Sequence, residues 1–345
     1  MPELLIWMYS TSQPHWSMPA SSVARVREAL GDEWTVRTIE HEIDATGDGP
    51  PATPEPVLEA IVDAEVYFGF GIARDAFRRA HRLRWVHSGA AGVGGSLFPE
   101  MLESAVLLTN SAGIYAEPMA DQALSMMLYF TRGLDGAVAG MRTREWRREA
   151  IVGPEGGVTE LGGAVVGIVG YGGIGCALGR RAKALGMRVW ALRRSEPAAG
   201  ERPEEVEWIS GADGLDELLR GSDYVVLTVP ETTETVGLIG ERELALMRRS
   251  GVLINVARGR ILDEEALAAA LRGSRLRGAG LDVFREEPLP ADSPLWELDN
   301  VLITPHIGGT SQRFWDRQTE LMIRNIGNYL AGHALENLVD KRLGY

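Results

Sequence analysis

The fold of this chain is decided by the stretch V-V-G-I-V-G-Y-G-G-I-G at residues 165–175. Its first five residues form the short apolar run of a buried strand, and the glycines that follow have the spacing G-x-G-x-x-G. Apolar residues between Ala177 and Leu185 then recur at helical spacing. The glycines alone also suit a turn in any α/β protein. The strand before them and the helix after them favour a dinucleotide site, with the helix N-terminus facing the pyrophosphate.

Length and composition limit the classes of protein to consider. At 345 residues the chain exceeds one typical domain core, so we expect about two domains. The net charge of −13 argues against a nucleic-acid partner, because phosphates need an excess of cations. The single cysteine, Cys176, excludes an intrachain disulfide and a cysteine-based zinc cluster. No apolar run approaches the roughly 18 residues that span a bilayer. We therefore expect a cytoplasmic protein without a metal or a membrane partner.

Strand and helix patterns recur along the whole chain and alternate most clearly after the glycine turn. Before the glycine turn, the candidate strands are 4–8, 34–39, 66–70, 84–87 and 105–109. The candidate helices are 23–30, 56–62 and 117–132, and a polar stretch follows at 142–157. After the turn, strands at 188–192, 224–229, 252–256 and 278–281 alternate with helices at 215–219, 241–247 and 264–271, and a last strand follows at 301–304. This alternation predicts a doubly wound parallel sheet. The last helix, 312–330, follows the complete sheet, so we expect it to return to the first domain.

Residues 88–95 form a loop of small residues, S-G-A-A-G-V-G-G. Successive backbone N–H groups without bulky side chains can form a concavity for an anion, and a carboxylate suits an acidic protein. A plain flexible turn is the alternative interpretation of this loop.

Three charged residues follow candidate strands of the second half. Arg258 follows 252–256, Glu287 follows 278–281, and His306 follows 301–304. Ligands of open α/β sheets bind at the carboxyl ends of the strands, so we expect the three side chains to meet there. Arginine binds carboxylates through two parallel hydrogen bonds, and a histidine beside a carboxylate has a raised pKa. Singly, each residue also suits a surface or loop role; together they suit proton transfer beside a hydride.

Four motifs of the chain resemble the D-isomer-specific 2-hydroxyacid dehydrogenases. They are G-Y-G-G-I-G (170–175), I-N-V-A-R-G (254–259), G-L-D-V-F-R-E-E-P-L (280–289) and T-P-H-I-G-G (304–309). The resemblance covers essentially the whole chain. It implies two Rossmann-like domains, in which a dinucleotide-binding domain (114–308) is inserted into a discontinuous flavodoxin-like substrate domain (1–113 and 309–345). It also implies an active site in a cleft, Gly113 and Gly308 as hinge candidates, and usually a homodimer.

The resemblance also assigns roles to individual residues. Arg258 would bind the substrate carboxylate, His306 would be the acid/base, Glu287 would pair with His306, and Asp282 would tune that pair. Substrate contacts would come from Ala91, Gly92 and Tyr115. Cofactor contacts would come from Gly170, Gly172, Gly173, Ile174, Gly175, Arg193, Arg194, Ser195, Val229, Pro230, Ala257 and Asp282. The implied reaction moves a hydride between NAD(P)H and a small 2-oxo acid, such as glyoxylate or hydroxypyruvate, or its D-2-hydroxy acid.

The chain departs from the family pattern at the cofactor ribose. In the general fingerprint an acidic residue after the second strand binds the ribose 2′-hydroxyl. Here Arg193, Arg194 and Ser195 stand at that place, and Arg193 follows Gly175 by 18 residues. Guanidinium groups suit a 2′-phosphate, so we expect a preference for NADP(H) over NAD(H). Two surface arginines in an NAD-binding or dual-specific enzyme are the alternative.

Two more departures leave the substrate side chain open. Gly94 stands where many members carry an acidic residue, and Tyr115 stands where histidine is common. Other functions also stay open on these residues: oxidation of another small anion such as phosphite, or a dinucleotide-sensing protein of the co-repressor type that binds a partner.

Overall fold

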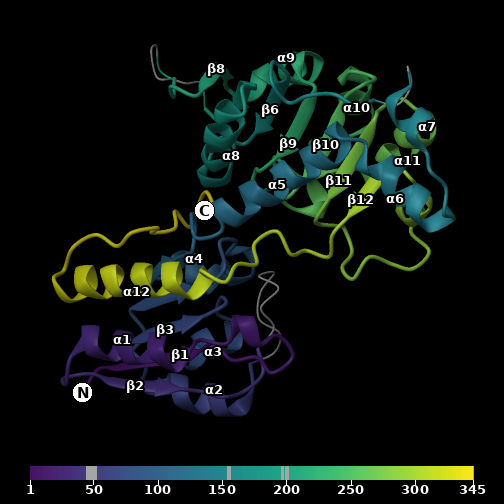
Figure 1. Cartoon of the computed structure of the whole chain (residues 1–345). Coiled ribbons are helices and arrows are strands. Elements are labelled where there is room, and N and C mark those ends of the chain that lie inside the picture. Colours follow the sequence, from purple (N-terminus) through teal and green to yellow (C-terminus); the bar gives the residue numbers. More distant parts are fainter. Residues whose placement is uncertain (44–52, 154–156, 196–197, 199–201, 345) are drawn as a thin grey trace. The chain divides into compact units, whose positions relative to one another are not determined.

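The computed structural model describes residues 1–43, 53–153, 157–195, 198 and 202–344 (Figure 1). Its contacts divide the chain into two compact units. Unit 1 comprises Met1–Tyr115 and Ser311–Tyr345, and unit 2 comprises Ala116–Thr310. The sequence placed the boundaries after Gly113 and after Gly308. Unit 1 is thus built from both ends of the chain.

Unit 2 is built on a seven-stranded parallel sheet. Its strands are β6 (Val165–Val169), β7 (Arg188–Leu192), β8 (Val206–Ser210), β9 (Tyr224–Leu227), β10 (Val252–Asn255), β11 (Gly278–Leu281) and β12 (Val301–Ile303). The spatial order is β12-β11-β10-β9-β6-β7-β8. This is the dinucleotide-binding order 3-2-1-4-5-6 with one more strand, and its order reverses between β6 and β9. The predicted doubly wound sheet is confirmed.

The strands of unit 2 are apolar on both sides because helices cover both faces of the sheet. Val252 and Ile254 of β10 join one core, and Leu253 between them joins the other. The first core includes α5 (Ala116–Thr131) and α8 (Gly173–Ala184); the second includes α9 (Leu215–Gly221), α10 (Glu241–Leu246) and α11 (Glu264–Arg272). A continuous run of β-branched and aliphatic residues is the signature of such a strand.

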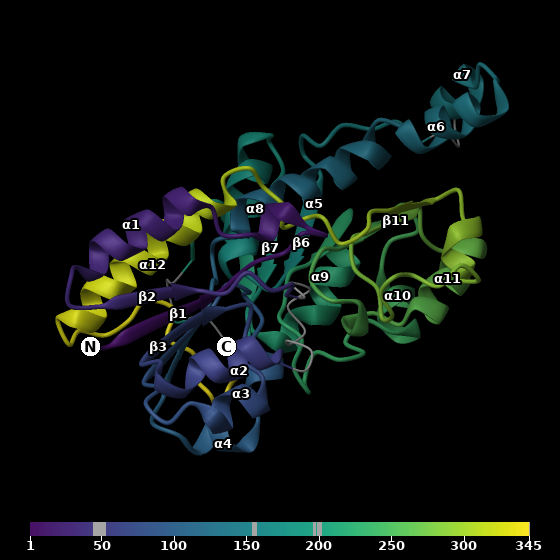
Figure 2. The same ribbon diagram turned by 90° about the horizontal axis from the view of Figure 1, so that it is seen from below.

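Two α-helices and one strand of unit 2 were not predicted. The polar stretch at 142–157 contains α7 (Arg148–Val152), and α6 (Leu134–Thr143) lies mostly before it. Figure 2 shows both helices beyond the end of α5. Glycines weaken the helical signal of α6, yet Gly140 is needed, because a Cβ there would lie 2.7 Å from the carbonyl oxygen of Glu145. The third element is the edge strand β8, in which only Val206 is fully buried and Glu207 is exposed.

Unit 1 contains a five-stranded parallel sheet in the order β2-β1-β3-β4-β5, the flavodoxin-like order. Its strands are β1 (Glu3–Trp7), β2 (Thr35–Thr38), β3 (Val66–Gly69), β4 (Trp85–Ser88) and β5 (Leu107–Thr109). Its helices are α1 (Ala20–Leu30), α2 (Glu55–Ala60), α3 (Arg74–Arg79), α4 (Pro99–Glu103) and α12 (Phe314–Leu330). The fold class expected for both halves is therefore confirmed.

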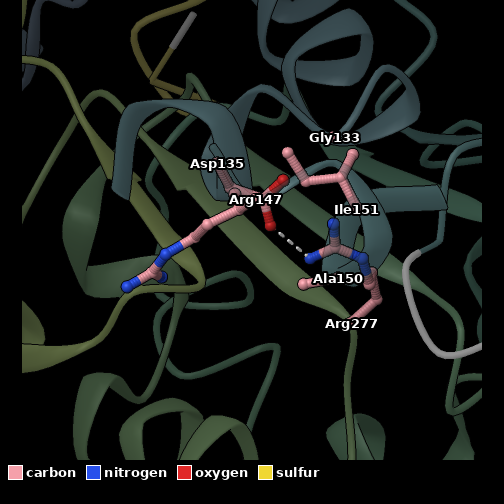
Figure 3. A pocket seen from close by; sticks show the side chains of 7 residues that line it. Gly133, Asp135, Arg147, Ala150, Ile151 and Arg277 are labelled. Carbon is pink, nitrogen blue, oxygen red and sulfur yellow. Dashed lines mark ion pairs between the residues drawn. The ribbon is translucent and has the colours of Figure 1, made fainter. Parts of the chain in front are cut away.

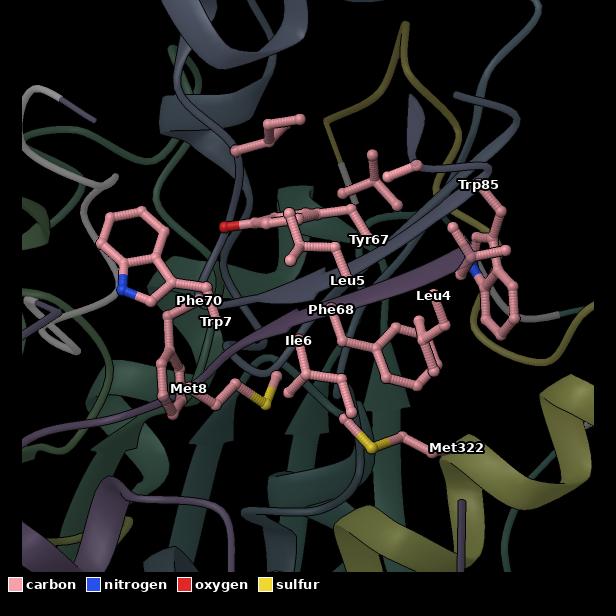
Figure 4. Close-up of a cluster of buried hydrophobic side chains, with 14 of the residues drawn as sticks. Leu4, Leu5, Ile6, Trp7, Met8, Tyr67, Phe68, Phe70, Trp85 and Met322 are labelled. Carbon is pink, nitrogen blue, oxygen red and sulfur yellow. The ribbon is translucent and has the colours of Figure 1, made fainter. Parts of the chain in front are cut away.

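The last helix, α12, belongs to the core of unit 1. Its Phe314, Leu321, Met322 and Ile326 are buried in the cluster that also holds β1, β3 and β4 (Figure 4). Helix α12 packs along α1, and the segment after it pairs with β5 through Leu338 and Thr109. Within the described residues, every helix is too short or too polar to cross a membrane.

Candidate active site

The three glycines of the turn after β6 serve three different purposes. Gly170 has φ +106°, and a Cβ there would lie 2.8 Å from the backbone nitrogen of Val229. A Cβ on Gly175 would lie 2.5 Å from the carbonyl oxygen of Gly170, so this glycine lets α8 approach β6. A Cβ on Gly172 would meet nothing within 4 Å. Packing explains the first and third glycines; the second leaves space at the N-terminus of α8, as a bound pyrophosphate requires.

The other predicted cofactor residues of unit 2 lie at the carboxyl ends of its strands. Gly173 and Ile174 begin α8, and Ala257 follows β10. Val229 and Pro230 follow β9, where the hydroxyl of Thr228 donates to the carbonyl oxygen of Gly170 at 2.6 Å. The residues present therefore fit a dinucleotide at the point where the strand order reverses.

Arg193, Arg194 and Ser195 directly follow β7. Arg193 is half-buried, and its backbone N–H donates to the carbonyl oxygen of Ser210 at 3.1 Å. The exposed guanidinium of Arg194 lies 3.9 Å from the Glu234 carboxylate. Two guanidinium groups therefore stand where the general fingerprint has an acid.

A buried asparagine shapes the turn that carries Arg258. The side chain of Asn255, at the end of β10, accepts from the N–H of Ala257 and donates to the carbonyl oxygen of Arg258, both at 3.0 Å. The guanidinium of Arg258 donates to the carbonyl oxygen of Ala257 at 2.8 Å and is partly exposed. The backbone and one hydrogen bond thus hold the guanidinium at the end of the strand. Asn255 lies inside a quoted motif, but no role was predicted for it.

His306 and Glu287 form a hydrogen-bonded ion pair. Nδ1 of His306 lies 2.7 Å from Oε2 of Glu287, and the second carboxylate oxygen accepts from the N–H of Phe284 at 2.9 Å. Each of the two side chains is about one-third exposed, at 35% and 33%. Because Nδ1 is engaged by the carboxylate, Nε2 is the ring nitrogen left to exchange a proton with a ligand.

The two partners shift each other's pKa in opposite directions. The hydrogen bond to Glu287 raises the pKa of His306 above its ordinary value, although burial and the charge of Arg258 oppose this. Burial acts to raise the pKa of Glu287, but hydrogen bonds from His306 and Phe284 outweigh it and the pKa lies below its ordinary value. The charge of Arg258 acts on both groups, so all three predicted residues share one electrostatic environment.

Asp282 acts on the backbone around His306. It is 1% exposed, and its carboxylate accepts from the hydroxyl of Thr304 and from the N–H groups of Ile307 (3.0 Å) and Gly308 (2.8 Å). Its charge also contributes to the raised pKa of His306. This buried carboxylate therefore organises the loop after β12. A Cβ on Gly308 would lie 2.7 Å from it, so this glycine permits close approach.

The predicted substrate residues Ala91, Gly92 and Tyr115 belong to unit 1. The carbonyl oxygen of Ala91 accepts from the side chain of Asn110 at 2.8 Å, and the hydroxyl of Tyr115 donates to the carbonyl oxygen of Gly89 at 2.6 Å. Asn110 and Tyr115 thus fix the small-residue loop. Their substrate contacts stay predictions.

A pocket of about 250 Å³ lies elsewhere, near the amino end of β11 (Figure 3). It is lined by Gly133, Asp135, Gly136, Arg147, Ala150, Ile151 and Arg277. The guanidinium of Arg277 lies 2.6 Å from the carboxylate of Asp135 inside it. None of the predicted site residues lines this pocket. Within the described residues, no cluster of three or more histidine, cysteine or acidic side chains suits a metal.

Comparisons with known proteins agree with this geometry. Residues 124–308 match the family model of the D-isomer specific 2-hydroxyacid dehydrogenase, NAD binding domain. Glyoxylate reductase from Thermococcus gammatolerans is 37% identical over 296 residues, covering 84% of this chain and 86% of the relative. Glyoxylate reductase from Thermococcus onnurineus is 36% identical over 335 residues, covering 94% of each.

Solved structures give the same result. The NADPH-dependent glyoxylate/hydroxypyruvate reductase from Sinorhizobium meliloti, in complex with NADP and sulfate, aligns with a TM-score of 0.79 at 26% identity, covering 99% of this chain and 100% of that one. A D-isomer specific 2-hydroxyacid dehydrogenase from Xanthobacter autotrophicus, in complex with NADPH and MES, aligns at 0.77 with 28% identity and full coverage of both chains. The chain belongs to the D-isomer specific 2-hydroxyacid dehydrogenase family and is an NAD(P)-dependent oxidoreductase.

Proposed function

We propose that this enzyme reduces glyoxylate, hydroxypyruvate or a similarly small 2-oxo acid to the D-2-hydroxy acid, with His306 as acid/base and NADPH as the preferred cofactor. The hydrogen-bonded pair of His306 and Glu287 carries the proposal, since it supplies an acid at the sheet edge that also holds the glycine turn. The glyoxylate reductases among the relatives support the substrate class.

The proposed mechanism gives each side chain one task. The nicotinamide, when bound, supplies the hydride of the reduction. The guanidinium of Arg258 binds the substrate carboxylate and so orients the 2-oxo group. Nε2 of His306 donates a proton to the oxygen that becomes the hydroxyl, and Glu287 stabilises the imidazolium before the transfer. In the oxidative direction His306 accepts that proton.

A turnover assay tests this proposal. The purified chain is mixed with NADPH or NADH and with glyoxylate, hydroxypyruvate, pyruvate or phenylpyruvate, and phosphite is tested with the oxidised cofactors. We expect the highest kcat/KM with glyoxylate or hydroxypyruvate. Turnover of phosphite alone, or of no 2-oxo acid despite tight dinucleotide binding, would overturn the proposal; the second result would favour a dinucleotide sensor.

The preference for NADPH rests on the residues after β7. Arg193 and Arg194 supply two guanidinium groups where an acidic residue would repel a 2′-phosphate. Arg193→Asp should move the ratio of kcat/KM for NADPH over NADH toward NADH by about 10- to 100-fold, since each charge-assisted hydrogen bond contributes about 1.5–3 kcal/mol. The matched control is Arg202→Asp, at an exposed arginine before β8, and it should leave this ratio unchanged. A wild-type enzyme that prefers NADH would contradict the assignment.

We also infer a homodimer, with α6 and α7 as the contact between copies. Large apolar side chains are exposed along this segment, notably Trp146 at 89% and Met141 at 79%. Exposed apolar clusters of this kind mark interaction surfaces. Light scattering after size exclusion should give twice the mass of 37.6 kDa. Trp146→Glu should shift the protein toward the monomer.

A further inference from the structure

Helix α5 is linked to the loop of His306 through a chain of three side chains. Nε2 of Gln122 on α5 donates to the hydroxyl of Thr304 at 3.0 Å, and this hydroxyl donates to the carboxylate of Asp282. Gln122 is half-buried, and a Cβ on Gly308 would lie 3.3 Å from its Cγ. The glutamine thus hydrogen-bonds to Thr304 at the start of the loop, and its stem lies close to Gly308.

The chemistry of the groups fixes the direction of these hydrogen bonds. An ionised carboxylate only accepts, so the single proton of the Thr304 hydroxyl points to Asp282. The hydroxyl oxygen then has lone pairs left, and the amide NH₂ of Gln122 is a donor that matches them. An acceptor in place of this amide would compete with Asp282 for the hydroxyl proton.

The loop that receives this support is under strain. His306 has φ +51°, in the left-handed region that side chains with a Cβ seldom adopt. Such a conformation persists where its surroundings over-determine it. Here the backbone N–H of His306 donates to the carbonyl oxygen of Asp282 at 2.8 Å, and the next two N–H groups donate to its carboxylate. Asp282 therefore determines the backbone on both sides of the imidazole.

We propose that Gln122 is a positioning residue for His306. Its amide keeps the hydroxyl of Thr304 oriented so that it donates to Asp282. This hydrogen bond holds the strained loop in the conformation that presents the imidazole to Glu287 and to the substrate. The inference rests on the proposed role of His306, and it adds a residue on a helix that contributes no group to the reaction itself.

Two substitutions at Gln122 separate this role from packing. Gln122→Met keeps the length of the side chain but removes the donor, and should lower kcat by about two- to tenfold, the size of one net hydrogen bond. Gln122→Glu is isosteric but replaces the donor by an acceptor, and should lower kcat by about 10- to 100-fold. KM for the cofactor should stay unchanged. Ser125→Ala, which removes an exposed hydroxyl that donates to the backbone of Gln122, is the matched control and should behave as wild type.

A double-mutant cycle and a titration complete the test. If Gln122 acts through Thr304, adding Gln122→Met to Thr304→Val should cause no further loss of kcat. The imidazole of His306, followed by NMR and assigned with His306→Gln, should titrate at lower pH in Gln122→Met, because its contact with Glu287 is loosened. The charged groups that act on it are Glu287, Arg258 and Asp282. The NMR titration needs no turnover, so it tests whether Gln122 affects the pKa of His306 even if the proposed reaction is wrong.

Equal effects of Gln122→Met and Gln122→Glu, additive losses in the cycle, or an unchanged titration of His306 would each overturn the proposal. The first two results would indicate a packing role. Full activity of His306→Gln would instead overturn the proposed function. The NMR titration would then still test whether Gln122 positions His306.

Discussion

Two histidines lie toward the carboxyl ends of parallel strands, one in each unit, and their surroundings differ. His87, in β4 of unit 1, is fully buried among neutral groups: Nδ1 lies 2.9 Å from the hydroxyl of Thr109, and Nε2 lies 2.8 Å from the amide nitrogen of Gln318. Burial lowers its pKa to about 3. His306, after β12 of unit 2, is partly exposed and bonded to a carboxylate that raises its pKa.

The difference shows that a place at the end of a strand does not make a histidine an acid. At neutral pH the His87 ring is uncharged, so one of its nitrogens can accept a hydrogen bond from the side chain of Gln318. This hydrogen bond connects α12 to the sheet of unit 1. An imidazole with a carboxylate partner and solvent access can hold and release a proton near neutral pH. The partner, more than the position in the fold, decides the role.

The largest effect that tests this contrast is expected at His306. His306→Gln removes the proton donor, and kcat for the reduction should fall by about 10²–10⁴-fold, the usual contribution of a general acid. Thermal unfolding should be little changed, because the side chain is one-third exposed. Steady-state assays with hydroxypyruvate and a melting curve measure the two quantities. Near-normal turnover would show that another group donates the proton.

The charged residues near the strand ends could be predicted from the sequence, but the polar residues that hydrogen-bond across each unit could not. Arg258, Glu287 and His306 could be found because each lies a few residues after an apolar run, and Gly170 and Gly175 because their spacing reflects close backbone approach. Gln122 and His87 could not be found. Neither residue belongs to a recognisable local motif, and their partners, Thr304 and Gln318, are 182 and 231 residues away.

Secondary structure was predicted well where packing is two-sided. Strand β10 is buried on both faces and reads as one apolar run, whereas the edge strand β8 is buried mainly at Val206. Helix α6 contains Gly136 and Gly140, which lower its helix propensity and so weaken its signal in the sequence. The approach of Glu145 to Gly140 could not be foreseen from local patterns.

A substitution at His87 should change stability and leave turnover intact. His87→Leu leaves the buried amide of Gln318 without its acceptor, and the free energy of unfolding at pH 7.5 should fall by about 1–3 kcal/mol. Urea unfolding followed by tryptophan fluorescence measures this loss. A substitution of the exposed His81, for example His81→Gln, is the control and should cost less than about 0.5 kcal/mol.

The pH dependence of that loss is a sharper test. The unfolded chain protonates His87 near its ordinary pKa of about 6.5, but the folded protein does so only near 3. Between these values the unfolded state binds the extra proton, so the wild type loses stability as the pH falls, by up to about 1.4 kcal/mol per pH unit. His87→Leu lacks this contribution, so its deficit should shrink below pH 6.5. A deficit that stays constant down to pH 5 would show that the ring is not held neutral.

Among the substitutions at His306, His87 and Glu287, the smallest effect is expected at Glu287. Glu287→Gln keeps an acceptor for Nδ1 of His306 but removes the negative charge that raises the pKa of the imidazole. The reduction needs the protonated ring, which is present below this pKa and lost as the pH rises through it. The variant should therefore lose activity at lower pH than the wild type, so its deficit in kcat/KM should be small on the acidic side and grow to on the order of tenfold as the pH rises.

A deficit at Glu287→Gln that is the same at every pH would break the comparison between the two histidines, because the carboxylate would then orient the ring without charging it. The exposed Glu286→Gln is the matched control, and its pH profile should follow the wild type. The oxidative direction adds an independent check. It needs the neutral ring, so the acidic limb of its profile should move to lower pH in Glu287→Gln, in the same direction as the alkaline limb of the reduction. Both limbs report the pKa of the same imidazole, which the reduction uses protonated and the oxidation uses neutral. A lower pKa of His306 must therefore move both limbs to lower pH.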